Sequence, residues 1–335
     1  LNGISGIGTG FSCNIAPYNP ITIISYLKSK LNGIPQTCEF IPYYEGFTGT
    51  VERVNDQKYL IKGLYEIIGD DKIRITELPI GTWTMPYVTF LESLMDGNIV
   101  DKKGKKVPPS IKDFTSVCTE VSIDITIVFP RGVLSKLESQ QDINGYNGVY
   151  KLLKLHTSVS TTNMHMFNSD CKLYKYKSIE EIIDDFYVVR LQMYVKRKLN
   201  MIANLEYNLL KLSNRARYIQ LTLNDTIDLR RKTTEQVNIL LSTNKLIHID
   251  GDYKYLIKMP MDSVTNENVM KIMKEKENLE NELKILNKTT VEQMWLSELT
   301  KLETEYNIYK KKREIIQLGT NNLDKNKPKK IKIKK

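Results

Sequence analysis

The chain has few of the residues from which metal clusters and disulfide frameworks are built. Its 335 residues include only four cysteines and three histidines. The cysteines are widely spaced, and no two of them form a CxxC pair. Zinc sites draw on closely spaced Cys and His ligands, so no metal site is expected here. We expect the thiols to be reduced, as in an intracellular protein.

Long apolar runs are also missing. No stretch approaches the roughly 18 to 20 residues that a membrane span needs, so no membrane contact is expected. The opening run Leu1-Asn2-Gly3 has neither the basic start nor the apolar centre of a signal peptide. Because the first residue is not Met, we expect the chain to be part of a longer protein.

Basic residues are in excess. The chain has 49 Lys and Arg residues against 39 Asp and Glu residues, which gives a net charge of +10. Such an excess favours a polyanionic partner, because each Lys or Arg that meets a phosphate releases a condensed counterion. A solvated Lys-rich surface would have the same composition, so the charge leaves both interpretations open.

The first half of the chain has mixed helical and strand signals. Residues 1–25 are rich in Gly and Pro and are expected to be mostly loop, with a short helix over 21–31. Residues 46–84 indicate strands with a hairpin at Gly69-Asp70-Asp71. A helix is predicted over 83–94. Apolar and polar residues then alternate over 121–129, which predicts a strand with one buried face.

The second half changes to long helices. Ser178 and Glu181 form a capping-box pattern that predicts a helix start. Apolar residues then recur in steps of three and four, the spacing of a coiled-coil seam. The first helix has Ile202, Leu205, Leu209, Leu212, Ala216 and Ile219, and the second, from Glu267, has Ile272, Leu279, Leu283 and Leu286.

The register of the second helix breaks at Lys288-Thr289-Thr290. There Thr289 and Glu292 suggest another capping box, before the spacing resumes at Trp295. Residues 221–262 between the two helices indicate a small globular segment. Together the patterns predict an antiparallel coiled-coil arm with a globular tip.

The chain ends in a run of lysines. Residues 325–335 contain seven of them, a composition that cannot form a packed core and predicts a disordered tail. Nuclear import, contact with a DNA backbone and a purely solubilising role all remain open for this tail.

Seven runs of sequence, in one order, resemble motifs of the type IIA DNA topoisomerases. A GIGTG run and an ITELPxxTWT-like run are the most distinctive, and the likeness is greatest to the eukaryotic type, in the compact form that large DNA viruses carry. The runs are Gly6–Ser12, Ile15–Pro20, Glu45–Glu52, Ile75–Thr84, Lys154–Ser158, Asp185–Leu191 and Tyr255–Pro260.

The resemblance implies an architecture. It implies an α+β tower (shoulder) domain with a DNA-bending loop over 1–177. A long antiparallel coiled-coil arm with a small globular dimerisation gate (C-gate) would follow over 178–318, and a basic disordered tail over 319–335.

The resemblance also implies a function. The whole enzyme would be a homodimeric, ATP- and Mg²⁺-dependent isomerase that relaxes and decatenates double-stranded DNA by double-strand passage. Its attacking tyrosine, metal site and ATPase module would all lie before residue 1, so no catalytic residue, metal or cofactor is expected in this chain. The expected location is the nucleus or, for a viral protein, the cytoplasmic replication site of the host.

The resemblance assigns the DNA contacts to three places. Ile15 would insert between base pairs and bend the duplex, although a buried local position for Ile15 is the competing interpretation. The Gly loop and the start of the next helix would contact the backbone, and the start of the arm would line a cavity for transported DNA, unless its cations are simply solvated. The residues are Gly8, Thr9, Gly10, Tyr18 and Asn19, followed by Arg190, Arg197 and Lys198.

Tyr255, Leu256, Met259 and Pro260 resemble the element that supports the dimer gate. We further expect Trp83 to anchor the core at the junction of strand and helix.

Two other classes of protein compete with this interpretation. A non-enzymatic coiled-coil scaffold with DNA affinity explains the helical spacing and the charge, but not the GIGTG and ITELP runs. A dinucleotide-binding loop needs a strand before the glycines and a helix directly after them. Here Pro17 and Pro20 follow instead.

Overall fold

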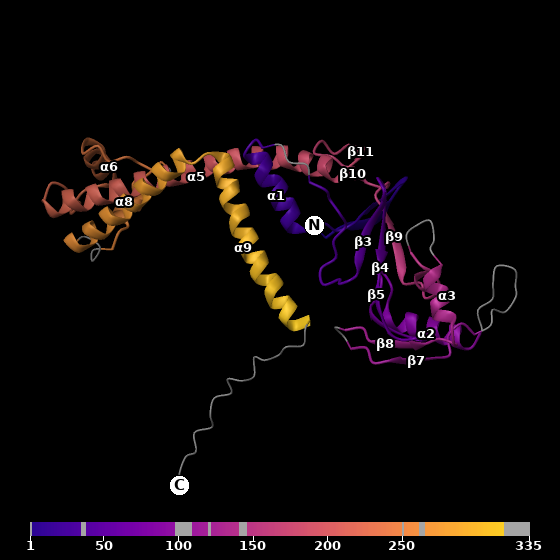
Figure 1. Cartoon of the computed structure of the whole chain (residues 1–335). Helices are drawn as coiled ribbons and strands as arrows, with labels where there is room; N and C mark the ends of the chain where they lie inside the picture. Colours follow the sequence, from indigo (N-terminus) through magenta and orange to yellow (C-terminus); the bar gives the residue numbers. More distant parts are fainter. Residues whose placement is uncertain are drawn as a thin grey trace, which may run out of the picture. The chain divides into compact units, whose positions relative to one another are not determined.

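The computed structural model describes residues 2–34, 38–97, 109–119, 122–140, 146–249, 251–260 and 265–317. They form two compact units. Figure 1 shows the chain coloured from its N-terminus to its C-terminus. Unit 1 comprises Leu1–Phe186 and Leu299–Lys335, and unit 2 comprises Tyr187–Glu298. These boundaries differ from the expected domains, because the first turns of the long helix and the chain from Leu299 pack within unit 1. The lysine-rich tail lies outside the described residues.

Unit 1 begins with a hairpin rather than the expected loop. Strands β1 (Ile4–Gly8) and β2 (Phe11–Ile15) pair antiparallel around Thr9 and Gly10. Gly10 has a φ of +83°, which an L-residue with a side chain rarely adopts and which this tight turn requires. The glycines hide the alternation of side chains by which a strand is read from sequence, so the hairpin was missed.

Helix α1 (Pro20–Leu31) follows the hairpin, close to the predicted 21–31. Asn19 ends the preceding segment, and its side-chain oxygen accepts the N–H of Ile21 at 2.9 Å. Pro20 occupies the first turn, where its missing N–H costs nothing. Cap and proline together place the start of the helix.

Two antiparallel sheets make up the rest of the strand-rich part. In the first the order is β3-β4-β9, and in the second it is β5-β6-β8-β7. The first contains β3 (Thr50–Asn55), β4 (Lys58–Lys62) and β9 (His156–Ser160), and the second β5 (Leu64–Gly69), β6 (Lys72–Glu77), β7 (Asp113–Ser116) and β8 (Ile125–Val128).

The chain passes from one sheet to the other at Gly63. A Cβ at this position would lie 2.4 Å from the carbonyl oxygen of Glu77, so only glycine fits between the sheets. Within the strand-rich region predicted over 46–84, the chain on either side of Gly63 therefore forms two strands, β4 and β5. The predicted hairpin at residues 69–71 is confirmed, with Gly69 opposite Lys72.

The core of unit 1 lies on one face of the four-stranded sheet. Ile73, Ile75, Ile125 and Ile127 are fully buried there, which confirms the inward face predicted from the alternation in 121–129. Three helices contribute to the same core: α2 (Thr84–Met95), α3 (Val133–Ser139) and α4 (Gly148–Leu152).

A second, short hairpin precedes the long helix. Strands β10 (His165–Phe167) and β11 (Leu173–Lys175) pair antiparallel, and Met164 forms a bridge with Cys13 of β2. Helix α5 (Ile179–Leu223) then begins as predicted, with the Ser178 hydroxyl accepting the N–H of Glu181.

In unit 2, α8 (Asn266–Lys288) lies along α5 in the opposite direction (Figure 1). The Nζ of Lys198 in α5 reaches the carbonyls of Asn287 and Thr289, whereas Ile219 near the end of α5 packs in a cluster with Ile272 near the start of α8. The predicted seam residues are the less exposed ones of both helices, with Leu212, Ala216, Ile219 and Leu286 buried.

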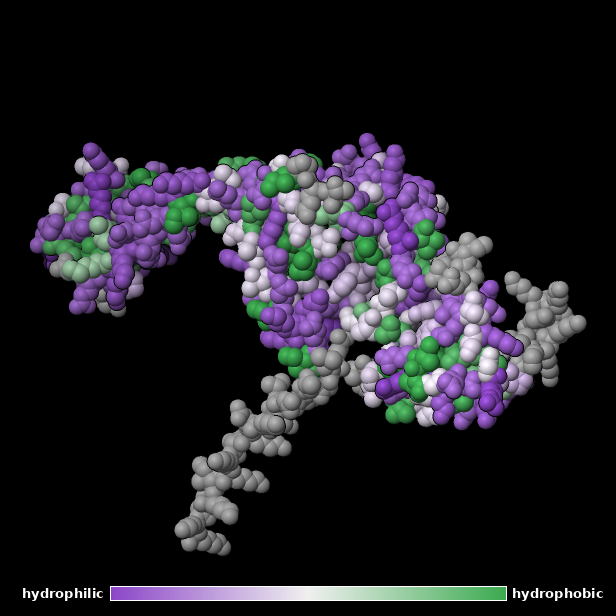
Figure 2. Space-filling view, in the orientation of Figure 1, coloured by the Kyte–Doolittle hydropathy of each residue, from purple (hydrophilic) through white to green (hydrophobic). Residues whose placement is uncertain are grey.

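The segment between these helices has its own core, as predicted for 221–262. It contains α6 (Thr234–Thr243) and α7 (Lys254–Ile257), which pack against the end of α5. Figure 2 shows hydrophilic side chains over most of the visible face of this end of unit 2, with apolar ones scattered among them.

Helix α9 (Val291–Gln317) follows the predicted break, but its cap differs from the expectation. Thr290 and Gln293 form the capping box, with the Thr290 hydroxyl accepting the N–H of Gln293 at 3.2 Å and the Gln293 side chain accepting the N–H of Thr290 at 3.0 Å. Thr289 instead donates its hydroxyl to the Ile285 carbonyl and ends α8. Either threonine followed three residues later by Glu or Gln satisfies the pattern, so sequence could not choose between them.

Candidate nucleic-acid interface

The tip of the β1–β2 hairpin exposes one large apolar side chain. Ile7 is 93% exposed and stands directly opposite Ser12, one residue before the Gly8–Phe11 pair that closes the turn. Ile15, the residue expected to enter the duplex, is half-buried at the base of the same hairpin, opposite Ile4. Ile7 was not among the residues predicted from the sequence, because a lone apolar residue between glycines carries no periodic signal.

The glycines of the tip have different roles. A Cβ on Gly8 would lie 2.5 Å from the ring of Phe11, so Gly8 makes room for that ring. A Cβ on Gly6 or Gly10 would meet nothing within 4 Å. The backbone at Thr9 and Gly10 is therefore open to a large partner.

Tyr18 and Asn19 belong to the frame behind the hairpin rather than to its surface. Tyr18 is only 4% exposed, and its ring meets that of Phe40 edge to face at 6.2 Å. Burial raises the pKa of its phenol above the usual 10. The Asn19 side chain caps α1, as described above. Tyr18 therefore packs behind the hairpin, and Asn19 fixes the start of the helix that follows it.

The three cations at the start of the arm are engaged within unit 2. Arg197 pairs with Glu298 at 2.8 Å, and the guanidinium groups of Arg190 and Arg197 lie 5.1 and 5.6 Å from the ring centre of Tyr194. Lys198 donates to the Thr289 carbonyl at 2.7 Å, at the end of α8. Arg197 and Lys198 thus tie α5 to α9 and to the end of α8, whereas Arg190 contacts Tyr194 within α5. Sequence alone could not separate these contacts from solvation or DNA contact.

Glu298 is the centre of this network. The Tyr194 hydroxyl also donates to its carboxylate. Burial opposes ionisation of Glu298, but the hydrogen bonds from Tyr194 and Arg197 outweigh it and lower the pKa of the carboxyl below its usual 4.5. The rings of Tyr187 and Tyr194 each stack on Trp295 with centroids 5.4 Å apart, which completes the cluster.

The residues expected at the dimer gate lie partly inside the end segment of unit 2. Leu256 is fully buried, Met259 packs against the same core, and Tyr255 donates its hydroxyl to the Ile247 carbonyl at 2.5 Å. Burial raises the pKa of Tyr255 to about 12. Pro260 is exposed.

The large apolar side chains that this segment does expose are others. Ile239, Ile247 and Ile257 are among those that reach solvent. Ile239 and Ile247 fall outside the recognised run Tyr255–Pro260, and Ile257 lies within it but was not singled out from the sequence.

Trp83 does not anchor the core, contrary to the expectation. Its side chain is 78% exposed, and Met85 beside it is also exposed. Leu78 and Tyr87, on either side of this segment, fill the core in its place. A large aromatic residue between a strand and a helix is big and apolar enough to fill a core. The direction of the extended backbone, however, decides where its side chain points.

Neither a metal site nor a membrane span emerges from the part of the chain that the structure describes. Within it, no three His, Cys, Asp or Glu side chains gather as metal ligands would. No helix there is both long and apolar enough to cross a bilayer.

Comparisons with known proteins agree on one family. The sequence pattern of the A-type subunits of DNA gyrase/topoisomerase IV matches residues 1–303. DNA topoisomerase 2 of Arabidopsis thaliana is 31% identical over 347 residues, which cover 91% of this chain and 22% of that protein. DNA topoisomerase 2 of Acanthamoeba polyphaga mimivirus is 30% identical over 366 residues, which cover 91% of this chain and 28% of that protein. The chain thus spans less than a third of either relative.

The fold is also similar to a solved structure. The DNA-binding, cleavage and re-ligation domain of Plasmodium falciparum topoisomerase II superposes with a TM-score of 0.80 at 30% sequence identity. The match covers 94% of this chain and 44% of that one.

Proposed function

The chain belongs to the DNA gyrase/topoisomerase IV family, and from this premise we propose that it is the DNA-bending and dimer-gate part of a type II DNA topoisomerase of the eukaryotic kind. The observation that carries the proposal is the exposed Ile7 at the hairpin tip, on a frame that resembles a DNA-binding cleavage domain. The open space around Gly6 and Gly10 on either side of Ile7 leaves room for a large partner to cover this side chain.

In this proposal the hairpin bends double-stranded DNA. Ile7 enters between two base pairs and opens the stack, at a cost on the order of a few kcal/mol that is offset by further contacts with the bent duplex. The backbone N–H groups of Thr9 and Gly10 donate to phosphate oxygens, which fixes the register of the DNA without reading its sequence. The wedge role expected of Ile15 thus passes to Ile7, because Ile15 lies at the base of the hairpin.

Unit 2 supplies the arm and the gate. We infer that α5 and α8 form an antiparallel coiled coil and that α6 and α7 meet their counterparts in a second copy across a two-fold axis. Tyr255, Leu256, Met259 and Pro260 would support this gate from inside, with Ile239 and Ile257 at its surface. Arg197 and Lys198 hold the helices together, and contact of Arg190, Arg197 and Lys198 with transported DNA stays a prediction.

The whole protein would carry out ATP- and Mg²⁺-dependent double-strand passage, relaxing and decatenating DNA. The described residues do not fit a Mg²⁺ site, since no three acidic, His or Cys side chains lie together among them. No step of the reaction is therefore assigned to metal or nucleotide here, and the chain by itself should bind and bend DNA without cutting it. We propose the nucleus or, for a viral source, the cytoplasmic replication site as its location.

The test compares Ile7→Ala with Ile15→Ala, a matched pair of isoleucines on one hairpin. A short duplex carries fluorophores at its ends and 2-aminopurine at its centre, so that energy transfer reports bending and emission reports unstacking. We expect the unaltered chain and Ile15→Ala to raise both signals at saturation, and Ile7→Ala to bind without raising either. A duplex that stays straight on the saturated, unaltered chain would overturn the proposal and favour a scaffold that only coats DNA.

A further inference from the structure

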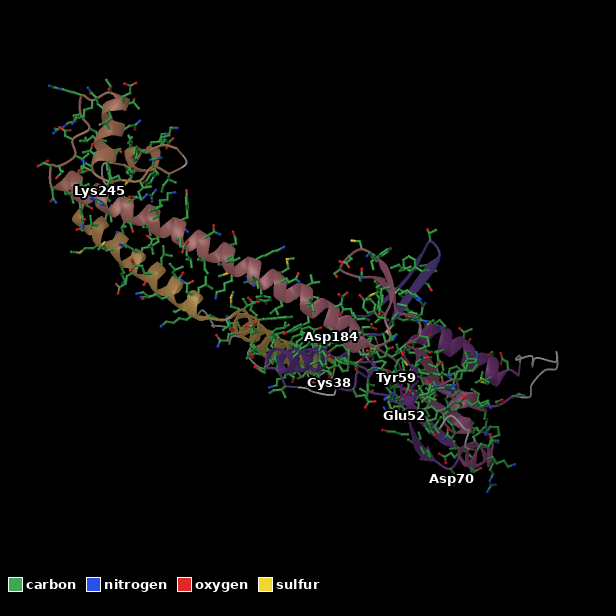
Figure 3. The ribbon with its side chains drawn as sticks, turned by 90° about the horizontal axis from the view of Figure 1, so that it is seen from above. Cys38, Glu52, Tyr59, Asp70, Asp184 and Lys245 are labelled. Atoms are coloured by element: carbon green, nitrogen blue, oxygen red, sulfur yellow. The ribbon has the colours of Figure 1, made fainter. Side chains whose placement is uncertain are left out.

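The β1–β2 hairpin is held along one edge by residues 163–167, far away in sequence. The two hairpins lie side by side (Figure 3). The carbonyl of Asn163 accepts the N–H of Asn14 at 2.8 Å, and its side-chain amide donates to the Ser12 hydroxyl at 2.7 Å. The side-chain oxygen of Asn163 lies 2.9 Å from Nδ1 of His165, which fixes the orientation of the carboxamide.

Apolar contacts support the same edge. Phe11 meets Phe167 edge to face, with ring centroids 5.7 Å apart and an angle of 88°. Cys13 and Met164 are buried where they form the bridge between the hairpins. Burial raises the pKa of the Cys13 thiol, which keeps it neutral in this contact.

The supporting hairpin is itself fastened to the start of α5. Tyr176 donates its N–H to the Met164 carbonyl at 2.9 Å and its hydroxyl to Asp185 at 2.7 Å. Tyr174 donates its hydroxyl to Glu181 at 2.7 Å. The edge that Asn163 presents to β2 is therefore connected to a long helix.

We propose that Asn163 is a positioning residue for the DNA-bending tip, and this inference rests on the proposed function of that tip. A two-stranded hairpin alone is at best marginally stable in water, so its direction depends on what holds it. Asn163 bonds to Ser12, and Ser12 stands opposite Ile7 in the ladder. Its carboxamide thereby sets the direction in which Ile7 projects, without touching the duplex.

The test is a double-mutant cycle of Ser12→Ala and Asn163→Ala. Asn55→Ala is the matched control, since it also removes one side-chain hydrogen bond of an asparagine: the Asn55 side-chain oxygen accepts the N–H of Gln57 at 3.0 Å, in a turn of another sheet. The first readout is hydrogen exchange of the amides in residues 4–15 without DNA. The second is 2-aminopurine emission of the duplex at saturating protein, measured beside the binding constant.

We expect Asn163→Ala and Ser12→Ala to speed exchange in the hairpin by about three- to tenfold, the range for loss of one hydrogen bond, and the double variant to fall short of the product of the two. Emission at saturation should drop in the same variants while the binding constant changes less than about twofold, because phosphates dominate affinity. A residue that only stabilised unit 1 would leave the saturated emission unchanged. If Asn163→Ala fails to fold, Ser12→Ala carries the test.

Two results separate this inference from the function on which it rests. Unchanged exchange and emission in both variants, with the Ile7 effect intact, would overturn the role of Asn163 alone. A straight duplex on the unaltered chain would overturn the bending function, and the exchange measurement would still decide whether Asn163 orders the hairpin.

Discussion

Leu256 and Ile257 are adjacent in sequence but differ in burial, and this difference can be measured. Leu256 is fully buried in the core of the end segment, whereas Ile257 is 40% exposed. Truncating a buried leucine to alanine removes its transfer free energy and leaves a cavity, which costs about 2–5 kcal/mol. Truncating a half-exposed isoleucine should cost roughly 1 kcal/mol, because less apolar area returns to water.

The assay uses the two tryptophans of the chain. Trp83 is largely exposed, so Trp83→Phe gives a background in which buried Trp295 alone reports on unit 2. With an m-value of about 2 kcal/mol per molar urea, Leu256→Ala should lower the urea midpoint of unit 2 by about 1–2.5 M. Ile257→Ala should lower it by about 0.5 M, half of that amount or less.

Light scattering over a dilution series measures how strongly each variant dimerises. Leu256→Ala should weaken any dimer because its end segment unfolds, and Ile257→Ala should weaken it while the fold is kept. Equal urea midpoints for the two variants would refute the reasoning, since they would show that the buried Leu256 contributes no more than the half-exposed Ile257.

Three further outcomes are expected. Trp83→Ser should change the free energy of unfolding by less than about 0.5 kcal/mol, as for other exposed positions. A large loss of stability would show that Trp83 does contribute to the core. Tyr87→Phe should cost about 1–3 kcal/mol in urea unfolding, because the buried carbonyl of Leu153 loses the hydroxyl that lies 2.8 Å away. The lowered pKa of Glu298 gives stability that is present above pH 4.5 and is lost as the pH falls through the folded-state value. Urea midpoints between pH 7 and 3 should show this loss, and Glu298→Gln should reduce it.

The glycine-rich start shows where sequence reasoning failed. Residues 4–15 lack the alternation of side chains that marks a strand, so the hairpin, and with it the exposure of Ile7, could not be predicted. Its pairing arises from backbone hydrogen bonds and from the edge offered by Asn163, which lies far away in the chain. The resemblance pointed to Ile15 and Tyr18, of which Ile15 is half-buried at the base of the hairpin and Tyr18 is buried, and their contact with DNA stays a prediction.

The arm shows the opposite case. The spacing from Ile202 to Ile219 and from Ile272 to Leu286 predicted two long helices, and both are present with those residues turned inward. The cations at its start were visible in the sequence, but their partners were not. Glu298 lies a hundred residues beyond Arg197, and only folding brings the two together.

By itself the sequence determined the elements with a regular apolar period and, through the order of its motifs, the family. The alternation at Ile125 and Ile127 and the seam of the long helices follow from local spacing, because burial of one face needs no knowledge of what covers it. Only the tertiary structure decided which exposed residue could meet DNA, which way Trp83 points and which charges are already paired. These depend on the direction of the backbone and on partners far away in the chain, and a local sequence pattern determines neither.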